Sequence, residues 1–393
     1  MVSALRDVLS LEGPPFHRRR WAPVIAVILL AVGAWWMFTH KASGLGMPDF
    51  EVYWTAGSRA AAAEPLYRES DLEYQFKYFP AFAVMAIPLA AIPLPAAKAI
   101  WFSAIVVSLV MLLRLGIQVL PDKRRSARWL VFIAIVVLGK YYARDLVLGQ
   151  INIMFTLVAT GAIVAIAGGR EVLGGVLVAL AVGIKPYALI LLPWILARRK
   201  RPSIAAACIG VAAVLLLPSL RYGFFGAMAL YKGWWTTVST TTGDTLMNRA
   251  NISVASMYVK WIGPGAPAWP AALTCAALLL TAALVFFYRR GVTRPEGLEG
   301  AVLLSIIPLI SPQGWDYVTV VCTAAVFFLA NYFDRLPALL RPLTVAACAV
   351  IGLTLYDLLG RVWLFRLLDL SVITVGFLVL VIALCALRVR KVA

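Results

Sequence analysis

Long runs of apolar residues alternate with short polar stretches along almost the whole chain of 393 residues. A helix needs about 20 apolar residues to cross a bilayer, and several of these runs are shorter. Because the runs are continuous and do not alternate in short segments, they predict membrane helices and not a β-barrel. The pattern predicts an all-α polytopic membrane protein with about twelve membrane helices. The candidate spans lie near 22–38, 96–118, 129–142, 151–167, 171–184, 186–197, 203–220, 268–288, 298–310, 317–331, 343–359 and 370–387.

Composition supports a membrane protein. Hydrophobic residues make up 62% of the chain and charged residues only 14%, and the mean hydropathy is +0.89. A soluble domain is about half apolar and about a quarter charged. The net charge of +18 would suggest nucleic acid on a soluble protein. Here the basic residues fall in short clusters between apolar runs, so we expect no nucleic-acid partner.

The basic clusters predict the orientation of the chain. The stretches "HRRR", "DKRRSAR", "ARRKR", "YRRGVTR" and "RVRK" fall on alternate connections. Lys and Arg are enriched in cytoplasmic loops. We therefore expect a single domain over 1–393 in the cytoplasmic (inner) membrane, with both termini in the cytoplasm. The segments 39–95 and 221–267 are then extracytoplasmic loops.

The segment 39–95 carries six of the 18 acidic residues, together with the apolar stretch "KYFPAFAVMAIPLAAIPLP". Four prolines interrupt that stretch, so we expect a helix that lies along the membrane interface or dips into it. The second loop contains "KGWWTTVSTTTGDTLMNRANIS", which is rich in aromatic, hydroxyl and amide groups. Loops of this kind carry binding sites more often than plain connections do.

Asp49 is the candidate general base. It follows Pro48 beside a probable span, where Phe50, Tyr53 and Trp54 would remove part of its water. The alternative is a solvated acid or a helix cap. Glu51, two residues further on, would point elsewhere on a helix, so we do not interpret the two acids as a catalytic pair.

Three cations on the same face can neutralise a phosphate. Lys185 lies at the turn "IKPY" between two short apolar runs, which are two tilted helices or one re-entrant feature. Arg144 and Arg249 are the other two. The alternatives are that Lys185 snorkels, that Arg144 only pairs with Asp145, and that Arg249 only contacts lipid headgroups.

Polar and aromatic groups at the ends of spans are candidates for substrate binding. The alternatives are interhelical hydrogen bonds for the polar groups and an aromatic belt for most of the tryptophans. The candidates are Tyr53, Trp54, Gln150, Asn251, Trp315, Asp316 and Tyr317.

We expect neither a metal nor a cofactor. The chain has only two histidines, and its five cysteines are widely spaced inside apolar runs. The glycines of "AGGREVLGG" lack the strand–loop–helix context of a nucleotide-binding loop. A transferred group would therefore come from a lipid donor.

Several blocks resemble glycosyltransferase family eighty-seven of the GT-C membrane superfamily, which includes polyprenol-phosphate-mannose-dependent α-mannosyltransferases. They are "PDFEVYWTAG", "EPLYRES", "FKYFPAFAVMAIPLAAIP", "RDLVLGQINIMF", "GGVLVALAVGIKPYALILLPWILARRKR", "NRANIS" and "SPQGWDYVTVV", in order over roughly 45–335. By this resemblance Asp49 matches the catalytic base and Lys185 the lysine of a Lys-Pro block. Many members have a histidine after the Trp-Asp pair, where this chain has Tyr317.

The resemblance implies a GT-C type enzyme whose extracytoplasmic loops carry the active site. It would transfer a hexose, mannose being expected, from a polyprenyl-phosphate donor to a glycolipid or glycan acceptor, with inversion and without a metal. Arabinofuranose on the same lipid phosphate would need similar groups. Two alternatives stay open: a transporter or flippase for lipid-linked saccharides, and a catalytically inactive membrane partner.

Overall fold

The computed structural model describes residues 33, 36–42, 46–288, 291–292 and 294–391. Much of the first apolar run, 22–38, lies outside these residues. The described residues are helical and form no strand, apart from one isolated antiparallel bridge between Asn251 and Trp315. Short 3-10 or π helices carry the label η. In chain order the elements are η1 (Phe38–Ala42), α3 (Pro48–Ala61), η2 (Glu69–Tyr74), α4 (Pro80–Ala90), α5 (Leu94–Gln118), α6 (Ala127–Leu148), α7 (Asn152–Ala167), α8 (Glu171–Ile184), η3 (Pro186–Ile190), α9 (Leu191–Ala197), α10 (Arg201–Leu216), α11 (Ser219–Met247), α12 (Val254–Ile262), α13 (Ala268–Tyr288), α14 (Glu296–Ile310), η4 (Asp316–Cys322), α15 (Thr323–Asn331), η5 (Phe333–Arg335), α16 (Leu340–Leu353), α17 (Tyr356–Asp369) and α18 (Val372–Val389).

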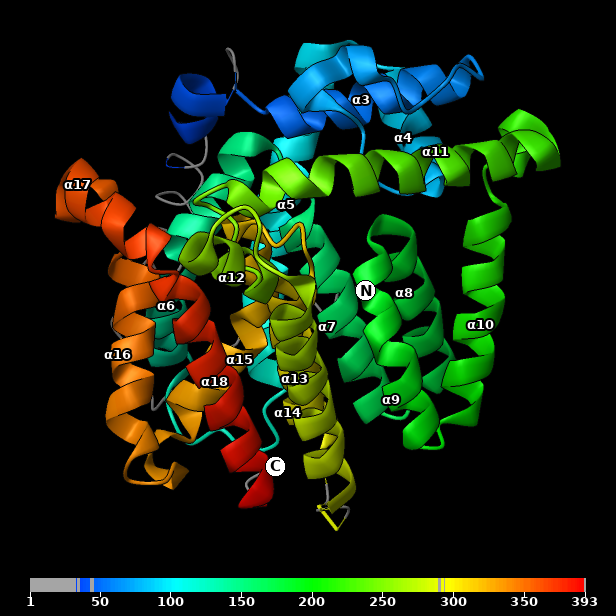
Figure 1. Cartoon of the computed structure of the whole chain (residues 1–393). Helices are drawn as coiled ribbons and strands as arrows, with labels where there is room; N and C mark the ends of the chain where they lie inside the picture. The colour runs from blue at the N-terminus through cyan, green and yellow to red at the C-terminus, as the bar shows by residue number, and fades with distance from the viewer. Residues whose placement is uncertain (1–32, 34–35, 43–45, 289–290, 293, 392–393) are drawn as a thin grey trace, which may run out of the picture.

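Figure 1 shows two layers. Upright helices, among them α8, α10, α13, α14, α16 and α18, form the lower part, and α3 and α11 lie across their upper end. The chain turns by 86° between α10 and α11 and by 106° between α16 and α17. These turns take α11 and α17 away from the direction of the upright helices.

The polytopic, all-helical architecture is confirmed, but the expected count of about twelve spans is not supported. Three described helices are long and apolar enough to cross a membrane: α5, α13 and α18. The number rises to at most six if each of the three bent helix pairs counts as one span. Several apolar runs are helices of 10 to 17 residues, such as α4 and α8. A run of apolar residues indicates burial, but it does not fix the length or direction of the helix.

The polar segment 221–267 is helical over most of its length, because α11 and α12 occupy it. Threonines of α11 bond to carbonyl groups one turn earlier on the same helix. Thr241 donates to Thr237 O at 2.7 Å, and Thr245 donates to Thr241 O at 2.8 Å. This local bonding satisfies the hydroxyl groups within the helix.

The helices α3 and α4 pack closely against each other. A Cβ atom at Gly57 would lie 2.7 Å from the carbonyl oxygen of Ala86, so only glycine allows this approach. Pro80 is the first residue of α4, a position where its missing N–H costs nothing. A proline also begins the helical element after α8: Lys185 has an extended backbone, and Pro186 is the first residue of η3. Two short helical elements therefore meet at Lys185.

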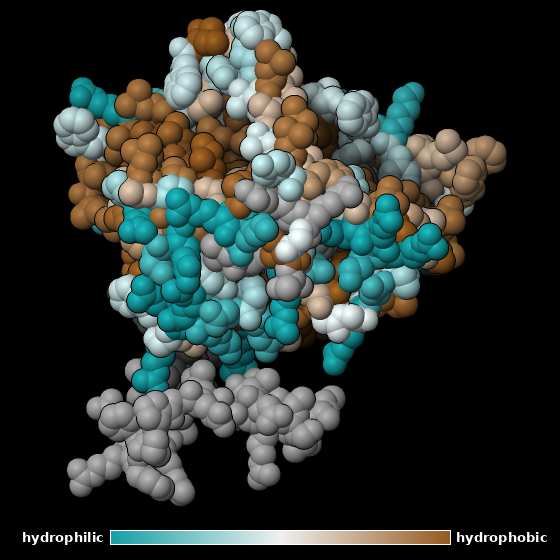
Figure 2. Space-filling model, turned by 90° about the horizontal axis from the view of Figure 1, so that it is seen from below, coloured by the Kyte–Doolittle hydropathy of each residue, from teal (hydrophilic) through white to brown (hydrophobic). Residues whose placement is uncertain are grey.

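Charged side chains gather at the lower end of the molecule. Figure 2 shows hydrophilic side chains concentrated across the middle and lower part of this view, with hydrophobic ones above and at the sides. The basic clusters of two connections, α5–α6 and α9–α10, and of the C-terminal end of α18 lie here. Their ion pairs are Arg124–Asp334, Lys200–Glu171, Lys200–Glu296, Arg198–Glu299 and Arg388–Glu299.

Candidate active site

The first turn of α3 lies against the turn between α6 and α7. The N–H of Met47 donates to the carbonyl of Val147 at 2.9 Å, which fixes the start of α3 at the end of α6. Gly149 has φ +69°, and a Cβ there would lie 2.8 Å from Cβ of Phe50. Glycine is therefore required at this turn, which brings Asp49 beside Gln150.

Three side chains from separate segments form a hydrogen-bonded cluster. The hydroxyl groups of Tyr53 and Tyr78 lie 2.7 Å apart. Both also lie within hydrogen-bond distance of Gln150 Oε1, at 2.9 Å and 3.1 Å; because each hydroxyl has one proton, one of them donates to this oxygen and the other donates to its neighbouring hydroxyl. Asn152 Nδ2 donates to the same oxygen at 3.3 Å and to Asp145 Oδ1 at 2.8 Å. The cluster joins α3, the segment before α4 and the turn between α6 and α7.

Asp49 lies among cations and next to this cluster. Burial raises the pKa of its carboxyl group, while a side-chain hydrogen bond with Gln150 lowers it. The positive charges of Lys185, Arg144 and Lys77 also lower this pKa. A partly desolvated carboxylate with a raised pKa is a better proton acceptor than one in water.

Lys185 is buried in the connection between α8 and η3, with only 7% of its surface exposed. Its ammonium group lies 5.2 Å from the ring centre of Tyr78 and 5.8 Å from that of Tyr187. Burial lowers the pKa of Lys185 to about 8, against the negative charges of Asp145 and Asp49, which raise it. A buried ammonium group among aromatic rings does not snorkel to a headgroup region.

Arg144 pairs with Asp316 and not with its neighbour Asp145. Its Nη1 lies 2.8 Å and 2.7 Å from the two carboxylate oxygens of Asp316. The guanidinium group also lies 5.4 Å from the ring centre of Tyr317, which stacks on Trp315 at an angle of 7°. The Trp315–Tyr317 segment is therefore held beside the end of α6.

Asn251 binds main-chain groups. Its Nδ2 donates to the carbonyl groups of Thr245 and Pro312, at 3.1 Å and 2.7 Å, and its Oδ1 accepts from the N–H of Ser253 at 2.9 Å. Both amide hydrogens are thus occupied. The residue joins the end of α11 to the segment before Trp315.

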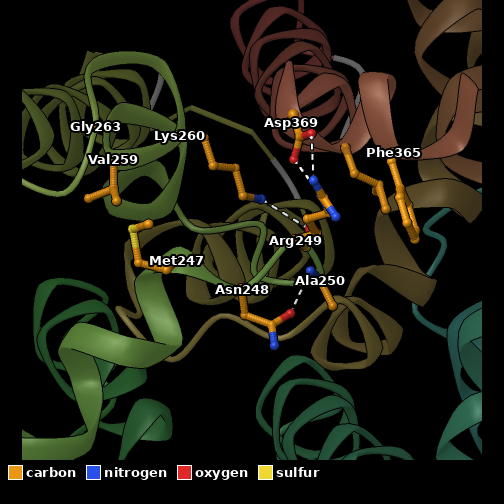
Figure 3. A pocket seen from close by; sticks show the side chains of 10 residues that line it. Met247, Asn248, Arg249, Ala250, Val259, Lys260, Gly263, Phe365 and Asp369 are labelled. Atoms are coloured by element: carbon orange, nitrogen blue, oxygen red, sulfur yellow. Dashed lines mark hydrogen bonds and ion pairs between the residues drawn. The ribbon is translucent and has the colours of Figure 1, made fainter. Parts of the chain in front are cut away.

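Three side chains point away from Asp49. Trp54 donates from its ring N–H to the carbonyl of Ile92 at 3.1 Å. Glu51 accepts from Lys98 Nζ at 2.5 Å. Arg249 pairs with Asp369 at 2.7 Å, beside a cavity of about 780 Å³ (Figure 3). Of the predicted site residues, Trp54 and Arg249 thus lie outside the cluster, whereas Glu51 points elsewhere as expected.

The sequence interpretation missed Lys77, Tyr78 and the part played by Asp145. The signal for the first two was the stretch "FKYFP", which puts polar groups directly before a helix that starts with proline. Asp145 was considered only as a partner of Arg144. It binds instead to Asn152 and to the N–H of Ile153, at 3.1 Å for the latter.

The described part of the chain contains no group of three or more His, Cys, Asp or Glu side chains placed to hold a metal ion. The cations around Asp49 are the groups available to bind an anion. The arrangement thus offers the Asp49 carboxylate, the cations Lys185, Lys77 and Arg144, the last of them paired with Asp316, and a set of hydroxyl and amide groups.

The fold and this site define a membrane-embedded, all-helical protein with a polar site at the end opposite its basic face. The sequence model of Glycosyltransferase family 87 matches residues 76–312, and the chain belongs to this family. It is accordingly a membrane glycosyltransferase. The matched range includes Arg144, Gln150 and Lys185 but begins after Asp49. No curated protein and no solved structure matches the chain.

Proposed function

We propose that the protein transfers a hexose, mannose being expected, from a polyprenyl phosphate to a glycolipid or glycan acceptor. Family membership supports the transferase class. The observation that carries the finer proposal is the carboxylate of Asp49 within the electrostatic reach of Lys185, Arg144 and Lys77. A carboxylate can take the proton of an acceptor hydroxyl, and adjacent cations can stabilise a phosphate leaving group.

The reaction is a single displacement. The acceptor oxygen attacks C1 of the sugar while Asp49 takes the hydroxyl proton. The bond between C1 and the phosphate oxygen breaks, and its electron pair leaves with the polyprenyl phosphate. Attack opposite the leaving group inverts C1, so a β-linked donor gives an α-linked product. The transition state resembles an oxocarbenium ion, as in glycoside hydrolysis.

The cations stabilise the leaving phosphate. Lys185 is buried and offers its ammonium group at the meeting of α8 and η3. Arg144 shares its charge with Asp316, and Tyr317 lies next to it. In this proposal the phenol of Tyr317 donates a hydrogen bond where many relatives have a histidine, and Lys185 and Arg144 supply the charge. Stabilisation of a developing anion by fixed donors needs no metal.

The tyrosines and Gln150 hold the base in place. The Gln150 carbonyl oxygen accepts from the hydrogen-bonded pair Tyr53 and Tyr78, so its amide N–H₂ group points away from them. This orientation turns the amide donor toward Asp49, whose pKa reflects a hydrogen bond with Gln150. The free carboxylate oxygen then faces the acceptor hydroxyl.

We place the site on the extracytoplasmic face of the cytoplasmic membrane. The basic connections gather at the lower end, and α3, which carries Asp49, lies across the upper end (Figure 1). Basic residues mark the cytoplasmic side of membrane proteins. A polyprenyl-phosphate sugar presented on the outer leaflet would then reach Asp49 at the depth of its phosphate.

A panel of donors tests the proposal. The purified protein is incubated with polyprenyl phosphates of mannose, glucose and arabinofuranose and with a lipid extract as acceptor, and products are identified by mass. Asp49→Asn keeps the shape but cannot take the proton, so turnover should fall at least about a hundredfold. Donor affinity should change little.

Glu51→Gln is the matched control, since Glu51 pairs with Lys98 away from the site. It should have a far milder effect. If Asp49→Asn retains near-normal turnover while Glu51→Gln is inactive, the base has been assigned to the wrong acid. If the unaltered protein makes no product from any donor, the chain is a non-catalytic member of the family.

A further inference from the structure

A second cluster of polar groups surrounds the cavity of about 780 Å³. The end of α11, the helix α12 and the end of α17 line it, and Figure 3 shows Arg249, Lys260, Asn248, Asp369 and Phe365 around the same space. The cavity is separate from Asp49, because neither Asp49 nor Lys185 lines it. The residues that line the cavity therefore determine what it can bind.

Arg249 presents hydrogen-bond donors to this cavity. Its Nε and Nη2 lie 2.7 Å and 3.2 Å from the carboxylate oxygens of Asp369, and its guanidinium group lies 4.5 Å from the ring centre of Phe365. Arginine has five N–H donors, so two face Asp369 and three remain for a ligand. Half of each side chain of this ion pair is exposed, at 50% and 48%. Water screens an ion pair this exposed and keeps it weak, so an anionic ligand can compete for Arg249.

Lys260 adds a second cation. Its ammonium group donates to the carbonyl groups of Arg249 and Asn251, at 3.1 Å and 2.6 Å. An ammonium group has three donors, which leaves one for a ligand. The cavity therefore has two cations against the single carboxylate of Asp369. This excess of positive charge favours an anion.

The remaining walls suit a lipid. Met247, Val259 and Leu368 give the cavity an apolar lining. Trp261 on α12 and Trp363 on α17 are half or more exposed, which is typical of residues at a membrane–water interface. A ligand that combines an anionic group with apolar chains at the membrane–water interface is a phospholipid, so the anion bound here would be its headgroup.

We propose that this cavity binds the phosphate-bearing headgroup of the lipid acceptor, with Arg249 and Lys260 as its cations. The role of the lipid as acceptor rests on the proposed function, whereas the binding of an anionic headgroup does not. The main chain next to the cavity is tied to the Asp49 end, since Ala250 O accepts from the N–H of Asp316 at 2.9 Å. An acceptor held here lies beside the segment that Arg144 contacts.

Binding of short-chain lipids to the full-length protein in neutral detergent tests the proposal. The probes are dihexanoyl phosphatidic acid, dihexanoyl phosphatidylcholine and inorganic phosphate, and calorimetry gives each Kd. We expect phosphatidic acid to bind more tightly than phosphatidylcholine. Arg249→Gln and Lys260→Met should each raise its Kd about ten- to hundredfold, the effect of a hydrogen bond to a charged group.

Asp369→Asn is the decisive control, because it removes the competing carboxylate and should lower the Kd. If the ion pair were only structural, Arg249→Gln and Asp369→Asn would act in the same direction or not at all, and either result overturns the proposal. Equal affinity for inorganic phosphate, with the same pattern among the variants, supports an anion site but overturns the lipid assignment.

The assay is independent of turnover. Binding in the Asp49→Asn protein should match that of the unaltered protein. A protein that binds the lipid but transfers no sugar contradicts the proposed function alone. If the enzyme is active but Arg249→Gln leaves its Kd for phosphatidic acid unchanged, this inference alone is contradicted.

Discussion

Lys185 is a buried ammonium group at the meeting of two short helices, and the proposed role requires it to contact the donor phosphate. Lys185→Met keeps much of the apolar stem and removes the charge. A hydrogen bond to a charged group contributes about 1.5–3 kcal/mol, so kcat/KM for the donor should fall about ten- to hundredfold. Steady-state kinetics with varied donor measure this. Unchanged kinetics would make Lys185 a structural residue.

The same residues predict the pH dependence. Asp49 must be ionised to take a proton, and burial raises its pKa above 3.8, so the acidic limb of the rate profile should lie above that value. Lys185 must be protonated to bind phosphate, and its pKa is about 8. Activity should therefore fall as the pH rises through about 8. We expect a bell-shaped profile of kcat/KM.

Lys185→Arg separates the two limbs, because arginine stays protonated throughout the accessible range. Its profile should lose the fall near pH 8 and keep the acidic limb. An alkaline limb that is identical in this variant would mean that another group titrates there.

The sequence predicted which residues belong to the site better than it predicted where their side chains point. Asp49, Tyr53, Gln150 and Lys185 were all selected from pattern and resemblance, and the structure brings them into one region. Arg249 was selected on the same grounds, yet its side chain pairs with Asp369, which is 120 residues further along the chain. A loop residue gives no periodicity from which its side-chain direction could be derived.

At the scale of the elements, the sequence indicated where apolar helices occur but not where the chain turns. The pairs α6–α7, α10–α11 and α16–α17 bend by 118°, 86° and 106°. The first of these bends is packed by a distant segment, since Met47 and Phe50 lie against Gly149. The helix α11 could not be predicted from its polar composition, because its threonines are satisfied by their own helix.

A buried charge network joins the helices α9, α14 and α18. Glu299 of α14 is fully buried and accepts from Arg198 at the end of α9, from Arg388 of α18 at 2.9 Å, and from Trp194 at 2.9 Å. Loss of one partner from a buried ion pair costs about 3–5 kcal/mol. Glu299→Gln should lower the unfolding midpoint in detergent strongly, because two guanidinium groups then face a neutral amide.

Glu296→Gln is the control for this stability prediction. Glu296 lies 3.9 Å from Lys200 at the same end of the molecule, and both side chains are partly exposed. A pair of this kind contributes about 0–1 kcal/mol, so the midpoint should barely change. Equal loss in the two variants would show that Glu299 has no special part in joining α9, α14 and α18.

At the scale of the whole molecule, charge and chemistry lie at opposite ends. The connections between α5 and α6 and between α9 and α10 carry basic residues at the lower end. The start of α3 and the turn after α6 carry the proposed site at the upper end. This separation follows from the fold and was implied by the alternation of basic clusters along the sequence. The proposed orientation predicts which end of the molecule is accessible from outside the cell.

Cysteine labelling with a membrane-impermeant reagent tests this prediction. Ala62 follows α3 at the upper end and Lys123 lies between α5 and α6 at the lower end, and both are exposed. The five native cysteines lie in apolar helices and would be replaced by alanine beforehand. Ala62→Cys should react in intact cells, because the proposed orientation puts the Lys- and Arg-rich lower end in the cytoplasm. Lys123→Cys should react only after permeabilisation. The reverse pattern would place Asp49 in the cytoplasm, where a donor on the outer leaflet could not reach it, and the proposed reaction would then need a donor on the inner leaflet.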